Sequence, residues 1–84
     1  MDNFNIRFGK TVKGLREQWG INQQRLAELL NISRPAISQI ESGERKISAE
    51  ELKKLSEIFH IPLDNLLNLE KEPEVVLKRR KREQ

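Results

Sequence analysis

The sequence has no cysteine and no tyrosine, and it has one histidine and one tryptophan. Without cysteine, disulfides and thiolate chemistry are excluded. A lone histidine with no cysteine beside it is neither a metal site nor a convincing catalytic base. The sequence also offers no other group of residues that could together supply a nucleophile, a base or a set of metal ligands. We therefore expect no enzyme activity, no cofactor and no metal.

Long hydrophobic runs are also missing. No apolar stretch approaches the roughly 18 residues that a bilayer-spanning helix needs. The N-terminus lacks the order of charged, apolar and small residues that marks a signal peptide. These absences favour a soluble protein of a reducing compartment, and we expect it in the cytoplasm.

The chain is short and basic, but its charge is uneven. Its 84 residues suffice for one domain with a modest core, and they carry 16 basic and 13 acidic residues, a net charge of +3. A run of basic residues, Lys78 to Arg82, lies in the last segment, and without residues 70–84 the basic and acidic side chains nearly balance. We expect a compact domain over residues 1–69 and a charged tail over residues 70–84.

Apolar spacing and capping residues predict an all-α fold with five helices. Apolar residues recur at three- and four-residue steps along the whole domain, and strand-like alternation does not occur. Asn22, Ser33 and Ser48 are suitable N-caps, Ser48 with Glu51 in capping-box spacing, and Gly20, Asn31 and Gly43 suit left-handed helix ends. The expected helices cover residues 4–19, 22–30, 33–42, 48–59 and 62–67.

The second and third predicted helices are short, and only Asn31, Ile32 and Ser33 join them. In this arrangement one helix braces against DNA while the next enters the major groove. Helical spacing places one set of residues on the inner side of the third helix, namely Ala36, Ile37, Ile40 and Glu41. The outer side is polar, and its members are Arg34, Pro35, Ser38, Gln39 and Ser42. Arginine can pair with guanine, glutamine with adenine, and a proline ring can contact a thymine methyl.

The segment from Leu15 to Gly43 resembles the phage repressor and Cro-like (XRE-type) helix-turn-helix family, and the resemblance extends over about residues 6–69. The matching stretches are INQQRLAELLNIS, from Ile21 to Ser33, and RPAISQIESGERKIS, from Arg34 to Ser48. Polar turn, cap and small-residue positions match together with the apolar ones. The resemblance implies a lambda-repressor-like domain that binds double-stranded DNA and regulates transcription.

The resemblance also implies roles for single residues. Arg34, Pro35, Ser38 and Gln39 occupy the base-reading positions. The expected phosphate-binding residues are Asn22, Gln23, Ser42, Arg45 and Lys46. The best-known phage members have glutamines at the start of the third helix, where this chain has Arg34 and Pro35, so their operator sequence cannot be transferred.

Three residues have structural interpretations. Glu41, on the inner side of the third helix, needs a partner because an unpaired buried charge is costly, and Arg16 is the expected one. Trp19 is expected to cover the core partly, and His60 to end the fourth helix.

A single recognition helix reads few base pairs, so we expect a homodimer, with exposed members of Leu63, Leu66 and Leu67 at its interface. A repressor is the favoured interpretation. The alternative is an antitoxin, or the partner of a protease or toxin, that also binds DNA and contacts its partner through residues 70–84. In that tail, Val75, Val76 and Leu77 suit a protein contact and Lys78 to Arg82 suit DNA phosphates, but a disordered terminus is an equal expectation.

Overall fold

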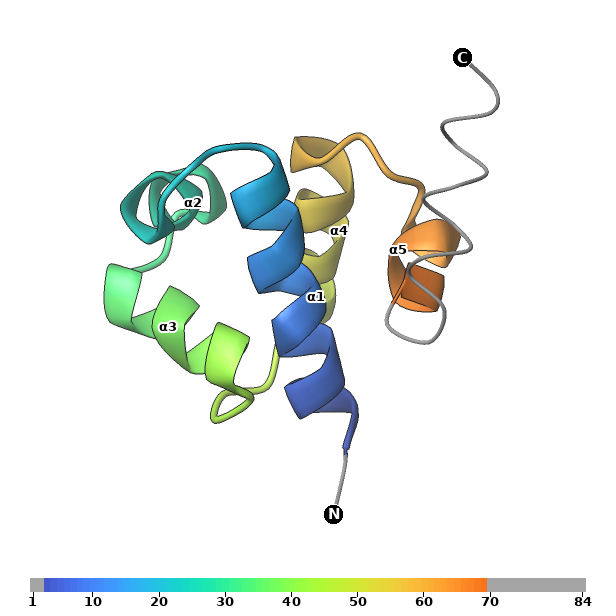
Figure 1. Ribbon diagram of the computed structural model, residues 1–84, viewed down its shortest axis with the longest axis horizontal. Coiled ribbons are helices and arrows are strands. Elements are labelled where there is room, and N and C mark those ends of the chain that lie inside the picture. The colour runs from blue at the N-terminus through green and yellow to red at the C-terminus, as the bar shows by residue number, and fades with distance from the viewer. Residues whose placement is uncertain (1–2, 70–84) are drawn as a thin grey trace.

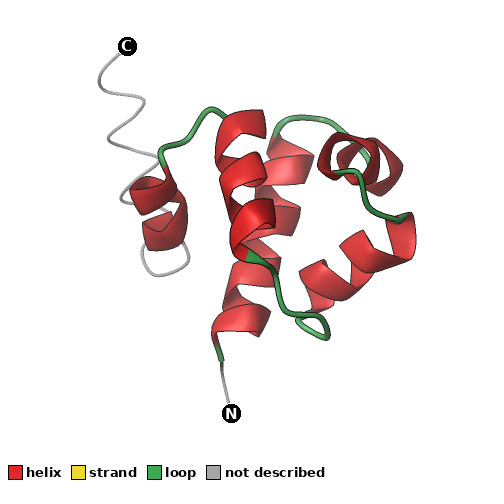
Figure 2. Cartoon of the chain, turned by 180° about the vertical axis from the view of Figure 1, so that it is seen from behind, coloured by secondary structure: helices red, strands yellow, loops and turns green. Residues whose placement is uncertain are grey.

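The structure, a computed structural model, describes residues 3–69. Within that range the chain forms five helices and no strand, as predicted. They are α1 (Phe4–Gln18), α2 (Gln23–Leu30), α3 (Arg34–Ser42), α4 (Ala49–Ile58) and α5 (Leu63–Leu69). Helices α2 and α3 lie on one side of α1, and α5 lies on the other (Figure 1). The view from behind shows the same arrangement (Figure 2). None of these helices is long and apolar enough to cross a membrane.

Side chains that precede the helices define where they begin. The N-cap side chains of Asn22, Ser33 and Ser48 each accept a hydrogen bond from the backbone N–H three residues later. Asn3 does the same for α1. Each bond satisfies an N–H that has no partner inside its helix. The capping box at Ser48 and Glu51 is present, so the sequence signals for these boundaries are confirmed.

Left-handed residues follow four of the helices. Gly20, Asn31, Gly43 and His60 all have positive φ. The sequence predicts this conformation for Asn31, and its φ is 60°. The turns are therefore short, and successive helices change direction within a few residues.

The core lies where the five helices meet. Its largest fully buried side chains include Phe8, Phe59, Leu26, Ile37 and Leu55. Helix α3 packs against α1 and α2, and α4 packs against α2 and α5. Both helices of the α2–α3 pair are thus held on their inner sides, and their outer sides face away from the core.

Gly9 allows the closest approach between helices. A Cβ atom on Gly9 would lie 2.3 Å from the carbonyl oxygen of Ile40 and 2.7 Å from that of Glu41. Any larger side chain would push the C-terminal half of α3 away from α1. The position of α3 therefore depends on the missing side chain at residue 9.

Leu66 corrects one expectation about α5. It is fully buried, whereas Leu63 is 40% exposed and Leu67 is half-buried. A helix as short as α5 stays in place only by burying its apolar side, and Leu66 is the residue that reaches the core. Leu66 is therefore not an exposed member of a dimer interface, and Leu63 and Leu67 remain candidates.

Candidate nucleic-acid interface

The connection between α2 and α3 is a tight turn. After Leu30, the left-handed Asn31 and the half-buried Ile32 reverse the chain, and Ser33 caps α3. The Ile32 N–H donates to the carbonyl of Ala27 at 3.0 Å, which closes the end of α2. Pro35 stands in the first turn of α3, where its missing N–H costs no helical hydrogen bond. The two helices thus form a helix-turn-helix (Figure 1).

Helix α3 has one buried and one exposed side. Ile37, Ile40 and Glu41 are buried. The exposed residues include Arg34, Pro35, Ser38, Gln39 and Ser42. These are the residues that helical spacing places on the outer side. They give α3 a surface of hydrogen-bonding groups with one apolar ring, which suits the edges of base pairs in a major groove.

The N-terminus of α2 carries Asn22 and Gln23. The Asn22 Oδ1 atom accepts from the N–H of Arg25 at 2.8 Å, so the side chain is held in place as a cap. Gln23 is half-buried, and its Nε2 donates to Oε1 of Glu41 at 3.0 Å. This second contact ties the start of α2 to α3, and no local pattern in the sequence indicates it.

A buried ion pair lies behind α3. The Nε atom of Arg16 is 2.7 Å from Oε2 of Glu41, and the two side chains are 11% and 5% exposed. Arg16 also donates from Nη2 to Glu41 Oε1 at 3.3 Å and from Nη1 to the carbonyl of Ile21 at 3.0 Å. The hydrogen bond to Glu41 is the main cause that raises the pKa of Arg16. The pair expected from the sequence therefore links α1 to α3, and Gln23 completes it from α2.

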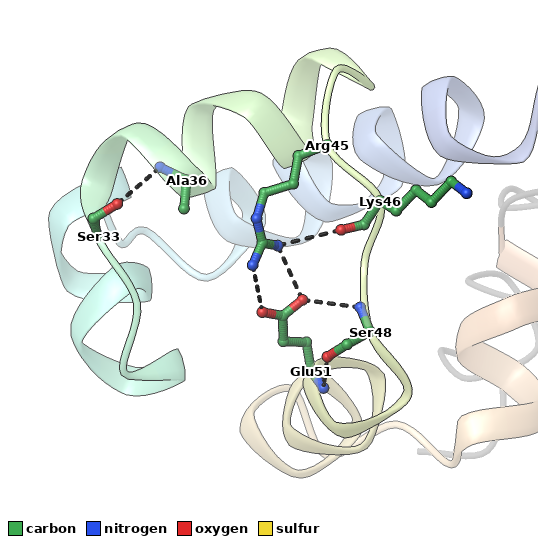
Figure 3. Close-up of polar contacts among 6 residues, drawn as sticks. All are labelled: Ser33, Ala36, Arg45, Lys46, Ser48 and Glu51. Atoms are coloured by element: carbon green, nitrogen blue, oxygen red, sulfur yellow. Dashed lines mark hydrogen bonds and ion pairs between the residues drawn. The ribbon is translucent and has the colours of Figure 1, made fainter.

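The loop after α3 carries Arg45 and Lys46. Both guanidinium Nη atoms of Arg45 donate to Glu51, at 3.0 Å to Oε1 and 2.9 Å to Oε2, while the side chain of Lys46 is exposed (Figure 3). The hydrogen bond from Arg45 is the main cause that lowers the pKa of the Glu51 carboxyl. The sequence predicts Glu51 as a capping-box residue, but it does not predict the pairing with Arg45.

Trp19 and His60 meet at the ends of α1 and α4. Their rings stack at a centroid distance of 5.7 Å, and Trp19 also packs edge-on against Phe59. Trp19 is 47% exposed, so it covers the core only in part. His60 takes the left-handed position after α4, and within residues 3–69 it belongs to no cluster of metal-ligating side chains.

These features define a class of protein: a small helical domain whose helix-turn-helix exposes a polar side of its second helix. The helix-turn-helix family model matches residues 12–66, and the chain belongs to this XRE-type family of DNA-binding transcription regulators.

The family relatives are regulators of different lengths. The chain is 36% identical over 74 residues to the control protein C.MunI of Mycoplasma sp, covering 86% of this chain and 100% of that protein. It is 38% identical over 63 residues to the HTH-type transcriptional activator BcrR of Enterococcus faecalis, covering 75% of this chain. The match spans 31% of the length of BcrR.

Solved structures share the fold. The restriction-modification controller protein C.AhdI from Aeromonas hydrophila superposes with a TM-score of 0.67 at 30% identity, covering 73% of this chain and 92% of that one. The clp gene regulator ClgR from Corynebacterium glutamicum superposes with a TM-score of 0.77 over 98% of this chain and 86% of its own. Because the identity to ClgR is 20%, this second likeness concerns the fold alone.

Proposed function

We propose that the protein is a sequence-specific transcriptional regulator that binds operator DNA as a homodimer, with α3 in the major groove. The observation that carries the proposal is the exposed side of α3. Arg34 and Gln39 point away from a core that holds the opposite side of the same helix through Ile37 and Ile40. The protein acts by binding, and its specificity comes from side chains on a rigid helix.

Base reading is assigned to Arg34, Pro35, Ser38 and Gln39. Arginine pairs bidentately with guanine and glutamine with adenine, so Arg34 and Gln39 carry most of the discrimination. Ser38 donates to either kind of base edge, and Pro35 contacts a thymine methyl.

Phosphate binding is assigned to Asn22 at the start of α2 and to Ser42 and Lys46 at the far end of α3. Asn22, Ser42 and Lys46 are exposed. Phosphate contacts at both ends of the helix-turn-helix set the register of α3 on the duplex but carry no sequence information. Gln23 and Arg45, expected in the same group, are left out of this assignment, because the amide of Gln23 donates to Glu41 and Glu51 holds the guanidinium of Arg45.

The interface of the homodimer is assigned to α5. Leu63 is 40% exposed and Leu67 is half-buried, so α5 offers an apolar surface beside the core. Two subunits joined there would read two half-sites about 34 Å apart, one turn of DNA. Repression is the simplest outcome, because a dimer bound over a promoter blocks polymerase and needs no further contact.

Selection of bound duplexes from a random DNA pool tests the proposal. We expect the selected sequences to contain an inverted repeat whose half-sites are about one helical turn apart. Footprinting on a selected duplex should show protection on one face, and a reporter placed downstream should lose expression when the protein is made. Recovery of duplexes with no common sequence would contradict the proposal.

A narrower candidate is a controller of a restriction-modification system. It is favoured by the match to the whole length of the control protein C.MunI and by the likeness to C.AhdI. This candidate predicts genes for a nuclease and a methyltransferase beside this one, and binding upstream of them. A neighbouring toxin or protease gene would instead favour the antitoxin alternative, whose contact residues, 70–84, lie outside the described part of the chain.

A further inference from the structure

The loop from Gly43 to Ser48 joins the recognition helix to α4, and two sets of hydrogen bonds fix it. At its start, the backbone N–H groups of Glu44 and Arg45 both donate to the carbonyl of Gln39, at 2.9 and 3.2 Å. Gly43 is left-handed, with a φ of 86°, and a Cβ atom there would lie 2.7 Å from a side-chain carbon of Ile6. The start of the loop is therefore bonded to the backbone of Gln39, to which base reading is assigned above, and it packs against α1.

At its other end the loop is held by Glu51. One carboxylate oxygen of Glu51 accepts from the backbone N–H of Ser48 at 2.9 Å and from Nη1 of Arg45 at 3.0 Å (Figure 3). The other oxygen accepts from Nη2 of Arg45 at 2.9 Å. Arg45 also donates to the carbonyl of Lys46 at 3.3 Å. Arg45 thus contacts the end of α3 through its backbone and the start of α4 through its side chain.

The positive charge of Arg45 is balanced by the carboxylate of Glu51. Its side chain is 33% exposed, and that of Glu51 is 11% exposed. A paired fork of this kind is stronger than a single neutral hydrogen bond, and moving Arg45 to a phosphate would leave a nearly buried carboxylate without its cation. That carboxylate would also repel the phosphate. Lys46, one residue later, has an exposed side chain, and no carboxylate of residues 3–69 lies within salt-bridge distance of it.

We propose that Arg45 is a positioning residue, which fixes the end of α3 and Gln39 relative to α4, and that Lys46 is the phosphate-binding cation of this loop. The inference rests on the proposed function, since it assigns the loop its part in DNA binding. It replaces the expectation that both basic residues bind phosphate.

The salt dependence of binding separates the two roles, because only a cation that neutralises a phosphate releases a counterion. The full chain and the variants Arg45→Gln, Lys46→Gln and Glu51→Gln are titrated against one duplex selected from a random pool, at several salt concentrations. Glutamine at position 51 keeps the capping box and removes the charge. Lys53→Gln, an exposed change on α4, is the matched control.

Lys46→Gln should lower the slope of log affinity against log salt by about 0.9, the value of one phosphate contact. Arg45→Gln should weaken binding several-fold with an unchanged slope. Glu51→Gln should make the slope steeper, by up to about 0.9, because Arg45 then has no carboxylate and its charge can reach the duplex. If Glu51 only held the loop in place, removing its charge would not make the slope of log affinity against log salt steeper. A slope that falls as far in Arg45→Gln as in Lys46→Gln, or one no steeper in Glu51→Gln than in the unaltered protein, would overturn the proposal.

Amide hydrogen exchange without DNA distinguishes failure of this inference from failure of the proposed function. The amides of Glu44 and Ser48 should exchange faster in Arg45→Gln, and at an unchanged rate in Lys46→Gln, if Arg45 holds the loop. If these amides exchange faster in Arg45→Gln but the unaltered protein selects no DNA sequence, the positioning role of Arg45 stands and the proposed function is rejected. Equal exchange in both variants rejects the positioning role itself.

Discussion

Single residues of α3 divide into those that face outward and those that hold the helix. Arg34 and Gln39 are exposed, whereas Glu41, on the other side, is 8% exposed. Changing an outward-facing residue should alter DNA binding and leave the stability of the fold unchanged. Changing a residue that holds the helix should alter the stability of the fold.

Arg34→Ala and Gln39→Ala should each lower affinity for the selected operator by about 1–3 kcal/mol, because each removes one pair of hydrogen bonds to a base. The preference at one base position should relax, and the melting temperature should stay close to that of the unaltered protein. Binding to a panel of single-base operator variants measures this, with Lys53→Ala as the control. If both variants kept the full sequence preference, α3 would not read the bases.

Arg16→Ala and Glu41→Ala should each lower the free energy of unfolding by about 3–5 kcal/mol, because each leaves the opposite charge buried without its partner. Arg25 and Glu28 provide the comparison, since their side chains are 59% and 54% exposed and lie 3.4 Å apart. Alanine at either of those positions should cost about 0–1 kcal/mol. Denaturant titration measures all four variants. Equal effects at the buried and exposed pairs would show that burial does not decide the cost.

At the scale of whole helices, two glycines of α1 should respond in opposite ways. Gly9 contacts the backbone of α3, whereas a Cβ atom on the exposed Gly14 would meet nothing within 4 Å. Gly14→Ala should raise the free energy of unfolding by about 0.5–1 kcal/mol, because alanine is the better helix former. Gly9→Ala should lower it by about 1–3 kcal/mol, because the added methyl group overpacks the contact with α3. Thermal melting of the two variants should therefore shift in opposite directions, and a gain in both would show that α1 and α3 can separate at little cost.

The start of α4 should lose stability in acid. Glu51 has a lowered pKa because Arg45 donates hydrogen bonds to its carboxylate, and such a group stabilises the fold above its unfolded pKa, about 4.3. That contribution is complete near neutral pH and is lost as the pH falls below about 5 and through the lowered value. The difference in free energy of unfolding between the unaltered protein and Glu51→Gln should therefore shrink as the pH falls. A difference that is constant with pH would show that the Arg45 pair contributes no stability.

The helices are predictable from local sequence, because the caps lie within three residues of the N–H groups that they bond. The contacts that the sequence does not reveal join residues across a turn or between helices. Gln23 and Arg45 both have the chemistry of phosphate ligands, yet the amide of Gln23 lies on Glu41 and the guanidinium of Arg45 lies on Glu51. Periodicity places a residue on a side of its helix, but it does not say which neighbouring helix that side meets. For the same reason, it could not show that Leu66 is buried while Leu63 is exposed.

At the scale of the whole molecule, the tail over residues 70–84 carries a prediction that lies outside the described residues. If Lys78 to Arg82 bind phosphates, a chain ending at Leu69 should have a salt slope lower by about 0.9 for each phosphate that is no longer neutralised, with the same preferred DNA sequence. Affinity would then weaken while specificity stays the same.

A different outcome is expected if Val75, Val76 and Leu77 hold a dimer. The shortened chain would then sediment as a smaller species without DNA, and operator binding would become steeper in protein concentration. Leu63→Ser in the full chain is the companion variant, since it should weaken a dimer that is joined through α5. An unchanged slope and an unchanged sedimentation coefficient in the shortened chain would reject both roles for the tail.

The packing of Trp19 against Phe59 and His60 has a practical consequence for all of these measurements. The chain has one tryptophan and no tyrosine, so its intrinsic fluorescence comes almost entirely from a single indole. That indole lies where the ends of α1 and α4 meet, and its emission should change when the two helices separate. The protein therefore carries its own optical probe of unfolding, and no dye or added label is needed to follow it.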